Sequence, residues 1–399
     1  MKKIGLVGFG WRLARVLIAM KRTGWDFEVV GFVDPSPNGQ AIAAAEGIEA
    51  GQAFASIEAL YAAAALDLVM IGSPNHLHLE HLKSCLARSV PVFCEKPIVR
   101  TQSESMELAD LLASRSDLPP LFVGLVLRSM PLVKEAIGRI HRGDLGALVS
   151  IDATEFLIPE HGAYLARNWR RKSEWGGSFL LDKACHDFDI FGWATGSLPR
   201  RVVSMGGLGV FKSDHAHMKR KYADGRTAYE LAPGGWSSAD DAFSSDMDVS
   251  DYQVALVDYH NGVKLTFHSN SHSAIPERRW VFMGTDGAMI VDLTRNRISF
   301  QKSLTLAEGR LGPPEPELSE LGALESESHN GADYAMARDL FASLSGTAPY
   351  PVTAWDCLEA GLAVMAVDQS LASGEVVDCR PMWALLAKAR VRADQGAVG

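Results

Sequence analysis

Apolar and polar residues follow two different rhythms in the first 125 residues of the chain. Short apolar runs indicate buried strands, and the stretches between them carry apolar residues at the 3.6-residue spacing of a helix. The strand-like runs are residues 3–7, 28–33, 68–71, 90–94 and 121–126, and the helical stretches are 12–22, 40–46, 56–65, 78–88 and 102–114. Strands that alternate with helices predict a doubly wound parallel sheet.

The pattern changes after residue 125. A helical stretch at 131–141 is followed mainly by strand-like runs, at 147–157, 200–210, 252–260, 262–270, 279–283 and 287–292. Tight turns between neighbouring runs, such as Asn261-Gly262, favour antiparallel pairing. Helical stretches at 331–345 and 354–372 follow, and we expect them to pack back on the body. The sequence thus predicts an α/β protein with one domain over 1–125 and an α+β domain over 126–399.

Two polar stretches interrupt the second domain. Residues 212–247 are rich in Gly, Ser and Asp, and residues 303–327 contain Gly312-Pro313-Pro314. Loops of this length inside a compact domain are usually functional or mobile. We therefore expect 212–247 to be a lid, an oligomer contact or a partly mobile segment.

Composition and charge narrow the classes of function. The chain has 399 residues, of which 47% are hydrophobic and 22% charged, as in ordinary globular proteins. Its net charge of −9 argues against nucleic acid or an anionic membrane surface as a partner. No apolar stretch approaches the roughly 18 residues of a membrane helix. Five scattered cysteines without C-x-x-C spacing predict reduced thiols, no zinc or redox cluster, and a cytoplasmic location.

Candidate chemistry begins at the turn after the first strand. Gly8 and Gly10 flank Phe9 between a strand and a helix, as in turns that hold a pyrophosphate at a helix N-terminus. The full fingerprint would have a small residue where Leu13 stands. Asp34 ends the second strand, 24 residues after Gly10, where a carboxylate accepts hydrogen bonds from a ribose and repels a 2′-phosphate. The turn therefore predicts NAD rather than NADP; a plain strand–turn–helix and a turn aspartate are the alternatives.

Two further strand ends point to the same edge of the sheet. Ser73-Pro74-Asn75 and Glu95-Lys96-Pro97 each follow a strand, and ligands of parallel sheets bind outside the carboxyl ends of the strands. Pro97 can hold Lys96 in a fixed turn, for which a cis peptide bond is one route. A lysine there places a positive charge beside an alcohol and favours the deprotonated form of that alcohol. The alternative is a surface lysine paired with Glu95.

A third feature is the helix that begins near Ser178. Asp182, His186 and Asp189 stand at i, i+4 and i+7, and so share one face of it. We expect Asp182 to orient His186 and to raise its basicity, as a general base requires. The alternative is a structural histidine.

These motifs occur together in one known family. The chain resembles the Gfo/Idh/MocA family of glucose–fructose oxidoreductases and inositol dehydrogenases over nearly its whole length. The matching motifs, in order, are Gly8-x-Gly10, Pro74-Asn75 with His78, Glu95-Lys96-Pro97, Gly143-x-x-Gly146, Trp169-Arg170, Gly176-Gly177 and Asp182-x-x-x-His186-x-x-Asp189. The resemblance implies a Rossmann domain, a second domain with a large open sheet, and a homodimer or homotetramer formed through that sheet.

The resemblance also implies hydride exchange between a nicotinamide and a hydroxyl or ketone of a sugar, sugar derivative or cyclitol. The family's catalytic lysine falls on Lys96, and its Asp/His pair falls on Asp182 and His186. Cofactor contacts are expected at Gly8, Phe9, Gly10, Trp11, Arg12, Asp34, Ser73, Pro74, Asn75, His78, Glu95 and Lys96. Substrate contacts are expected at Lys96, Arg128, Trp169, Arg170, Asp182 and His186, with Asp189 as a further candidate.

Four details stand outside this match. Leu13 departs from the small fingerprint residue, and Lys183 with Cys185 marks a subgroup in which these two residues have no role that we can assign. We expect Arg278-Arg279 to be an ordinary solvated pair. The spacing of His76, His78 and His81 could suggest a metal site. The cluster follows Pro74-Asn75, however, where the resemblance implies cofactor contacts, so we expect no metal there.

Two other functions remain open. Some relatives keep NAD bound and run a redox-neutral cycle that oxidises a sugar, eliminates a glycosidic bond and then reduces the product. A non-catalytic regulator could instead use the dinucleotide as a signal. Intact Lys96, Asp182 and His186 disfavour the regulator, because a sensor has no need of a base.

Overall fold

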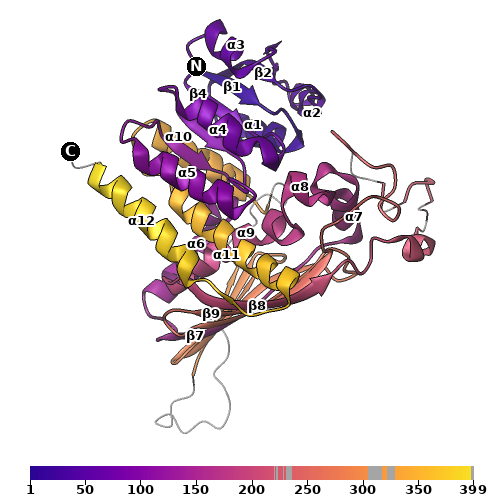
Figure 1. Ribbon diagram of the computed structural model, residues 1–399, viewed down its shortest axis with the longest axis vertical. Coiled ribbons are helices and arrows are strands. Elements are labelled where there is room, and N and C mark those ends of the chain that lie inside the picture. Colours follow the sequence, from indigo (N-terminus) through magenta and orange to yellow (C-terminus); the bar gives the residue numbers. More distant parts are fainter. Residues whose placement is uncertain are drawn as a thin grey trace.

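The computed structural model describes residues 1–219, 221, 223–227, 229–230, 236–303, 317–320 and 329–396. Gly312-Pro313-Pro314 and most of the stretch 303–327 lie outside the described residues. The described elements form two sheets with helices around and between them (Figure 1).

The first sheet has six strands in the order β3-β2-β1-β4-β5-β6, and every neighbouring pair is parallel. Its strands are β1 (Lys2–Val7), β2 (Phe27–Val33), β3 (Gln52–Ala53), β4 (Leu68–Ile71), β5 (Val92–Cys94) and β6 (Leu121–Val123). Its helices are α1 (Trp11–Arg22), α2 (Gly39–Ala45), α3 (Ile57–Ala63), η1 (Asn75–Leu77), α4 (His78–Leu86) and α5 (Gln102–Ser114). The predicted doubly wound parallel sheet is confirmed. The sequence pattern missed the two-residue strand β3.

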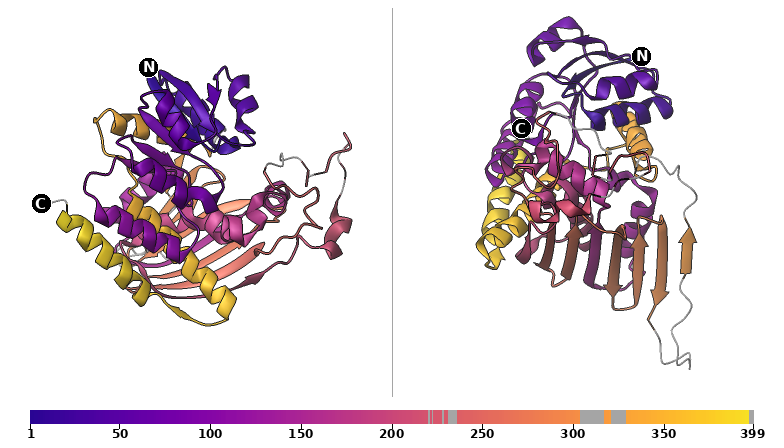
Figure 2. Two further views of the ribbon diagram at one scale, coloured as in Figure 1. Left: turned by 45° about the horizontal axis from the view of Figure 1, so that its top comes forward. Right: turned by 90° about the vertical axis from the view of Figure 1, so that its right-hand side faces the viewer.

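The second sheet has nine strands in the order β14-β13-β12-β11-β7-β10-β9-β8-β15 (Figure 2, right). They are β7 (Leu148–Phe156), β8 (Pro199–Gly207), β9 (Tyr252–Tyr259), β10 (Lys264–Asn270), β11 (Glu277–Gly284), β12 (Gly287–Asp292), β13 (Arg297–Lys302), β14 (Glu317–Glu320) and β15 (Val377–Asp378). Seven of the eight neighbouring pairs are antiparallel, whereas β7 and β10 run parallel. The sheet is therefore mixed but mostly antiparallel, as predicted.

Helices pack on one face of this second sheet. The remaining helical elements are η2 (Val126–Ser129), α6 (Pro131–His141), α7 (Pro159–Arg167), η3 (Trp169–Arg171), α8 (Ser173–Gly176), α9 (Phe179–Thr195), η4 (Ser213–Met218), α10 (Ala332–Leu344), α11 (Ala354–Ser373) and α12 (Arg380–Gly396). Figure 1 shows α9 and α11 between the two sheets. The hydroxyl of Ser178 caps α9 by accepting from the Leu181 N–H, and left-handed Gly196 ends the helix.

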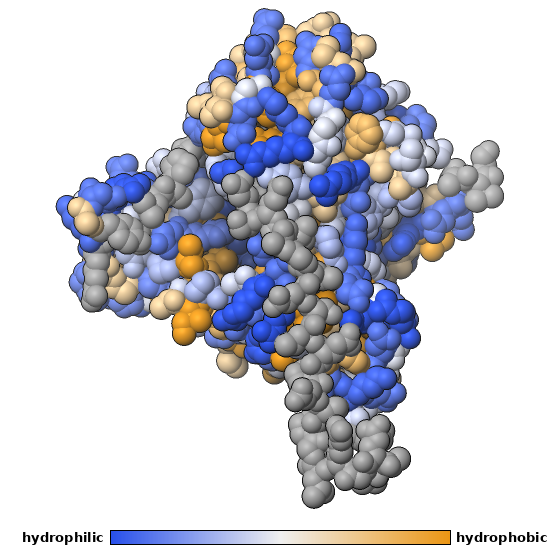
Figure 3. Space-filling model, turned by 180° about the vertical axis from the view of Figure 1, so that it is seen from behind, coloured by the Kyte–Doolittle hydropathy of each residue, from blue (hydrophilic) through white to orange (hydrophobic). Residues whose placement is uncertain are grey.

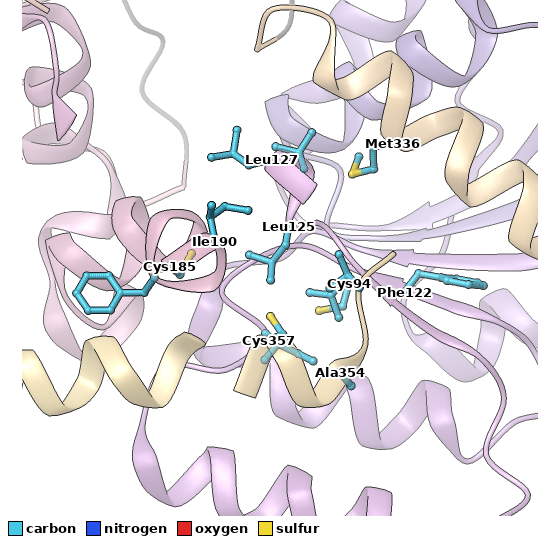
Figure 4. Close-up of a cluster of buried hydrophobic side chains, with 14 of the residues drawn as sticks. Cys94, Phe122, Leu125, Leu127, Cys185, Ile190, Met336, Ala354 and Cys357 are labelled. Carbon is cyan, nitrogen blue, oxygen red and sulfur yellow. The ribbon is translucent and has the colours of Figure 1, made fainter. Parts of the chain in front are cut away.

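One continuous apolar core joins the two sheets. Figure 4 shows Cys94 of β5, Cys185 of α9, Met336 of α10 and Cys357 of α11 in the same cluster. The C-terminal helices extend this packing, since α10 lies on α1 and α12 lies on α5. Because the apolar faces of α10 and α11 are buried against elements of the first half, the C-terminal segment is part of the scaffold of both sheets.

The described part of 212–247 packs beside α7. Phe211, Tyr229 and Phe243 form a small separate core with alanines of α7. The carboxylate of Asp251 fixes the start of this segment by accepting the N–H groups of residues 209, 210 and 211. No helix in the described ranges is long and apolar enough to cross a membrane. Most side chains visible in colour from behind are hydrophilic, with apolar ones in small patches (Figure 3).

Candidate active site

The glycine turn lies between the ends of β1 and β4. Gly8 has a φ of +82°, and a Cβ on it would lie only 2.3 Å from the backbone nitrogen of Ser73. A Cβ on Gly10 would meet nothing within 4 Å. Gly8 is therefore required by the protein itself, because only glycine fits that conformation and that gap. Gly10 is different: its missing side chain leaves open space at the N-terminus of α1, where a phosphate can approach the backbone.

Leu13 fits its irregular position because its neighbour is small. It is fully buried on α1, and a Cβ on Gly72 would lie 2.5 Å from the Leu13 Cγ. In the usual fingerprint a small residue on the helix lets helix and strand pack closely. Here Gly72, at the end of β4, provides that space and Leu13 of α1 fills it. The departure from the fingerprint thus does not disrupt the turn.

Asp34 is held beside the turn by backbone groups. Its carboxylate accepts the Phe9 N–H at 2.5 Å and the Ser36 N–H at 2.7 Å. The side chain is half-buried. This arrangement places a carboxylate next to the glycine turn, which suits a ribose diol and opposes a second phosphate.

Lys96 lies in a turn with a cis peptide bond to Pro97, as the sequence analysis allowed. Its Nζ donates a hydrogen bond to the backbone carbonyl of Asp182. The neighbouring Glu95 is buried and bonds instead to Arg12, with 2.8 Å between Arg12 Nε and Glu95 Oε1. The alternative of a surface lysine paired with Glu95 is therefore wrong. The amine of Lys96 points across to the N-terminal end of α9.

Arg12 uses its side chain within the protein. Besides Glu95, its guanidinium contacts Asp333 of α10 at 2.7 Å, and Asp333 is also 3.0 Å from the Nδ1 of His329. Arg12 can meet a phosphate through its backbone N–H, since the first N–H groups of a helix lack intrahelical partners. The Arg12 side chain is thus taken by Glu95 and Asp333, and the expected cofactor contact at Arg12 stays a prediction for its backbone N–H.

Two more expected cofactor contacts are buried beneath the strand ends. The ring of His78 lies 2.9 Å from the Ser73 carbonyl and 2.8 Å from the Pro97 carbonyl, so it connects the loops after β4 and β5. Burial lowers the pKa of His78 to about 4. The Asn75 amide donates to the carbonyl of Gly176 at 2.8 Å. His78 and Asn75 therefore hold these loops in place through hydrogen bonds to their backbone. Of the other two expected cofactor contacts, Trp11 is exposed at the turn and Pro74 is half-buried.

The N-terminal end of α9 carries a dense group of charges. Asp182 Oδ1 accepts from Arg170 Nε at 2.8 Å, and Asp182 Oδ2 lies 3.3 Å from Lys183 Nζ. Burial by itself would raise the pKa of Asp182. The charges of Lys96 and Arg170 outweigh burial and hold that pKa well below its ordinary range. Asp182 is therefore ionised, with Arg170 stacked on the Trp169 ring at 4.1 Å.

His186 does not have the partner that the helical spacing predicted. Its Nδ1 is buried and has no hydrogen-bond partner among the described residues, and Asp182 is engaged by Arg170 and Lys183. Burial, followed by the charge of Lys96, lowers the pKa of His186 well below its ordinary value. The expectation that Asp182 orients His186 and raises its basicity is wrong, because the cations around this site attract the carboxylate and oppose an imidazolium.

The other two carboxylates of α9 are structural. Asp189 forms a two-point pair with Arg128 at 2.7 and 2.8 Å, and both side chains are buried. Asp187 pairs in the same way with Arg278 of β11 at 2.6 and 3.1 Å. Arg128 and Asp189 thus join η2 to α9 instead of facing an opening, contrary to their expected place among substrate contacts. The expectation that Arg278 is a solvated residue is also wrong.

Two residues at the site escaped the sequence analysis as site residues. The sequence assigns no role to Lys183 and has no motif around His161 of α7, yet the two side chains lie 2.7 Å apart. The signal for Lys183 was present, since it follows Asp182 on α9. His161 had none, because the pattern missed α7. No group of three or more His, Cys, Asp or Glu side chains in the described part of the chain could hold a metal; His76 stacks on Trp236.

The fold and the site define a Rossmann-type oxidoreductase, and comparison with known proteins gives the family. Residues 2–124 match the model described as oxidoreductase family, NAD-binding Rossmann fold. Residues 137–379 match the C-terminal alpha/beta domain of the same oxidoreductase family. The chain therefore belongs to the Gfo/Idh/MocA oxidoreductase family, and its first domain is an NAD-binding Rossmann domain. The open space at Gly10 and the carboxylate of Asp34 fit that dinucleotide.

Two curated relatives and one solved structure show how similar individual proteins are to this chain. An inositol 2-dehydrogenase of Corynebacterium glutamicum (strain R) is 28% identical over 51% of this chain and 56% of that protein. A 2,7-anhydro-N-acetylneuraminate hydratase of Mediterraneibacter gnavus is 24% identical over 73% of this chain and 68% of that protein. Among solved structures, a levoglucosan dehydrogenase in complex with NADH and levoglucosan superposes with a TM-score of 0.74 at 18% identity, covering 94% of this chain and 99% of that one.

Proposed function

We propose that the protein is an NAD-dependent dehydrogenase that transfers a hydride between the nicotinamide and a secondary hydroxyl or ketone of a sugar, sugar derivative or cyclitol. One observation carries the proposal. The amine of Lys96 reaches the N-terminal end of α9 at the carboxyl edge of the Rossmann sheet, beside His186 on the same helix. The relatives named inositol 2-dehydrogenase and levoglucosan dehydrogenase favour a polyhydroxylated substrate.

In the proposed reaction, the role of each side chain follows from its charge. NAD, when bound, supplies the hydride acceptor. The positive charge of Lys96 favours the alkoxide form of a neighbouring hydroxyl. His186, held neutral by its surroundings, accepts the proton that this hydroxyl loses. Arg170 and Lys183 keep Asp182 ionised, and the Asp182 carboxylate can accept a hydrogen bond from a second substrate hydroxyl.

Asp34 favours NAD over NADP in this proposal. Its carboxylate stands beside the turn in a fixed orientation, where a 2′-phosphate would meet a like charge. We assign residues 1–125 to cofactor binding and 126–399 to substrate binding and assembly.

The test is a panel of sugars and cyclitols with NAD, followed at the absorbance of NADH. The panel contains levoglucosan, myo-inositol, common hexoses and uronic acids, with aryl glycosides in a parallel set. We expect NADH from at least one free sugar. In His186→Ala, turnover should fall about 10²–10⁴-fold while NAD affinity is unchanged. Full activity of that variant would contradict the role of His186. Release of the aryl group without net NADH would favour the redox-neutral rival.

We also propose self-association through the outer face of the nine-stranded sheet. On this face Met205 of β8 (75% exposed) lies beside Val254 of β9 (40%), and Leu256 of β9 is also apolar and exposed (52%). An apolar patch of this kind marks an interaction site. Light scattering of the protein and of Leu256→Lys would test it, since the charged variant should shift toward monomer.

The five cysteines are free and buried, which suits a reducing compartment such as the cytoplasm.

A further inference from the structure

Lys183 and His161 form a contact that the proposed reaction does not use. Lys183 follows Asp182 on α9, and its Nζ lies 2.7 Å from the Nε2 of His161 on α7. When Lys183 is an ammonium it can only donate, so the Nε2 of His161 accepts and is unprotonated in that state. The charged form of Lys183 therefore selects the tautomer of neutral His161 that carries its proton on Nδ1.

The pair leads from the inside of the site to its surface. The side chain of Lys183 is 13% exposed and lies 3.3 Å from the Asp182 carboxylate. His161 is exposed to solvent and has Tyr164 as its aromatic neighbour. A hydrogen-bonded pair with one member in the site and the other at the surface has the geometry of a proton path.

We propose that Lys183 and His161 relay the proton released by the substrate hydroxyl from the active site to solvent. This inference deepens the proposed function and depends on it. Lys183 lies one helical turn before His186 on α9, so the two side chains share a face. Within the described part of the chain, the Nδ1 of His186 is buried and has no hydrogen-bond partner, so no other residue occupies that nitrogen.

Charge explains why His186 needs an acceptor. Burial and the charge of Lys96 make an imidazolium at His186 unstable, so the proton does not stay there. Burial lowers the pKa of Lys183 to about 8, although the Asp182 charge opposes this shift. Transfer from His186 to a neutral Lys183 is therefore downhill. The charged groups that act on Lys183 are Asp182 on α9, Lys96 after β5, Arg170 of η3, Glu155 of β7 and His161 of α7.

The second transfer is coupled to the first. The charge of Lys183 is the largest cause of the lowered pKa of His161. When the ammonium of Lys183 gives a proton to Nε2, that charge disappears, and the pKa of His161 returns toward its ordinary value. The imidazolium of His161 then releases the proton on its other nitrogen to water. One proton leaves the substrate and one enters the solvent, while the hydride and its electron pair pass from the substrate carbon to NAD.

The first measurement needs no substrate. Long-range ¹H–¹⁵N spectra of the NAD-bound protein report the tautomer and the pKa of each histidine. We expect His161 to carry its proton on Nδ1 and to titrate well below 6.5. In Lys183→Met, its pKa should rise toward that value. An Nε2-protonated His161, or a pKa that does not move in Lys183→Met, would overturn the relay.

The second measurement is turnover of the panel sugar that the wild type oxidises fastest. We expect His161→Gln and Lys183→Met to lower kcat about 10²-fold, with an enlarged solvent deuterium isotope effect and little change in the KM for NAD. Imidazole added to His161→Gln should restore turnover. The wild-type rate should rise with pH as Lys183 loses its proton near pH 8, and this limb should be absent in Lys183→Met. His260→Gln and Lys388→Met, at exposed positions away from the site, are matched controls.

The outcomes separate the two proposals. Normal turnover in His161→Gln beside an active wild type contradicts the relay alone. Loss of turnover that imidazole does not restore also contradicts it, because a positioning role would explain such a loss. A wild type that forms NADH with none of the sugars contradicts the proposed function itself.

Discussion

The two ends of the candidate site, the glycine turn and the N-terminal end of α9, depend on different structural features. At the glycine turn, shape is the main feature: Gly8, Gly10 and Gly72 each matter through an absent Cβ. At the N-terminal end of α9, side chains from several elements meet, and their charges determine one another's protonation. The turn thus depends on glycines that leave room for close approach of the backbone, whereas the cluster depends on charged side chains that alter one another's protonation.

The largest test of this contrast is a matched pair of substitutions in the turn. Gly8→Ala should cost about 4 kcal/mol of unfolding free energy, because it combines a φ of +82° with a 2.3 Å overlap on backbone. Gly10→Ala should leave the stability of the NAD-free protein unchanged and weaken NAD binding. Denaturant unfolding and NAD titration measure the two effects. Equal destabilisation by both substitutions would mean that Gly10, too, is needed by the fold.

A smaller effect is expected from the pair formed by Leu13 and Gly72. Gly72→Ala should cost about 2 kcal/mol by overpacking, and Leu13→Ala about 3 kcal/mol by leaving a cavity. The double variant should cost less than the sum of the two, since the added methyl occupies space that the smaller residue vacates. A double-variant cycle in urea measures the coupling. Strict additivity would show that Gly72 does not compensate for Leu13.

The smallest effect concerns His78, which joins the turn side to the Lys96 side. The folded protein keeps His78 neutral down to about pH 4, while the unfolded chain binds a proton near pH 6.5. Stability from this residue is complete above pH 6.5 and is lost as pH falls, by about 2 kcal/mol between pH 6.5 and 5. His78→Gln should be less stable at neutral pH but lose less on acidification. If the unfolding free energy of His78→Gln fell with pH as steeply as that of the wild type, His78 would not be a cause of the loss of stability at acidic pH.

Much of the fold was predictable because its signals are local. The strand and helix rhythm of the first domain, the Ser178 start of α9 and the turn at Lys96-Pro97 all follow from residues close in sequence. The sequence pattern missed α7, α12 and β13, whose apolar residues are mixed with many polar ones. These elements are set by tertiary packing, which overrides the weak local preference.

Sequence motifs pointed to Lys96, Asp182 and His186 as candidates, but they could not predict which side chains pair with them. Helical spacing placed Asp182 and His186 on one face, yet it could not show that Arg170 and Lys183 would take the carboxylate. The same applies to Arg128, whose partner Asp189 lies 61 residues away. A carboxylate is drawn to whichever cations the fold brings near, and spacing along one helix does not contain that information.

The return of the C-terminal helices has a consequence for synthesis of the chain. The indole of Trp25 donates to the carbonyl of Ala337, and Arg22 donates to the hydroxyl of Tyr334, so α10 covers α1. During translation, the nucleotide-binding half emerges first but its surface is covered only after α10, α11 and α12 have left the ribosome. Nascent chains must therefore keep this apolar surface from aggregating until the last segment arrives.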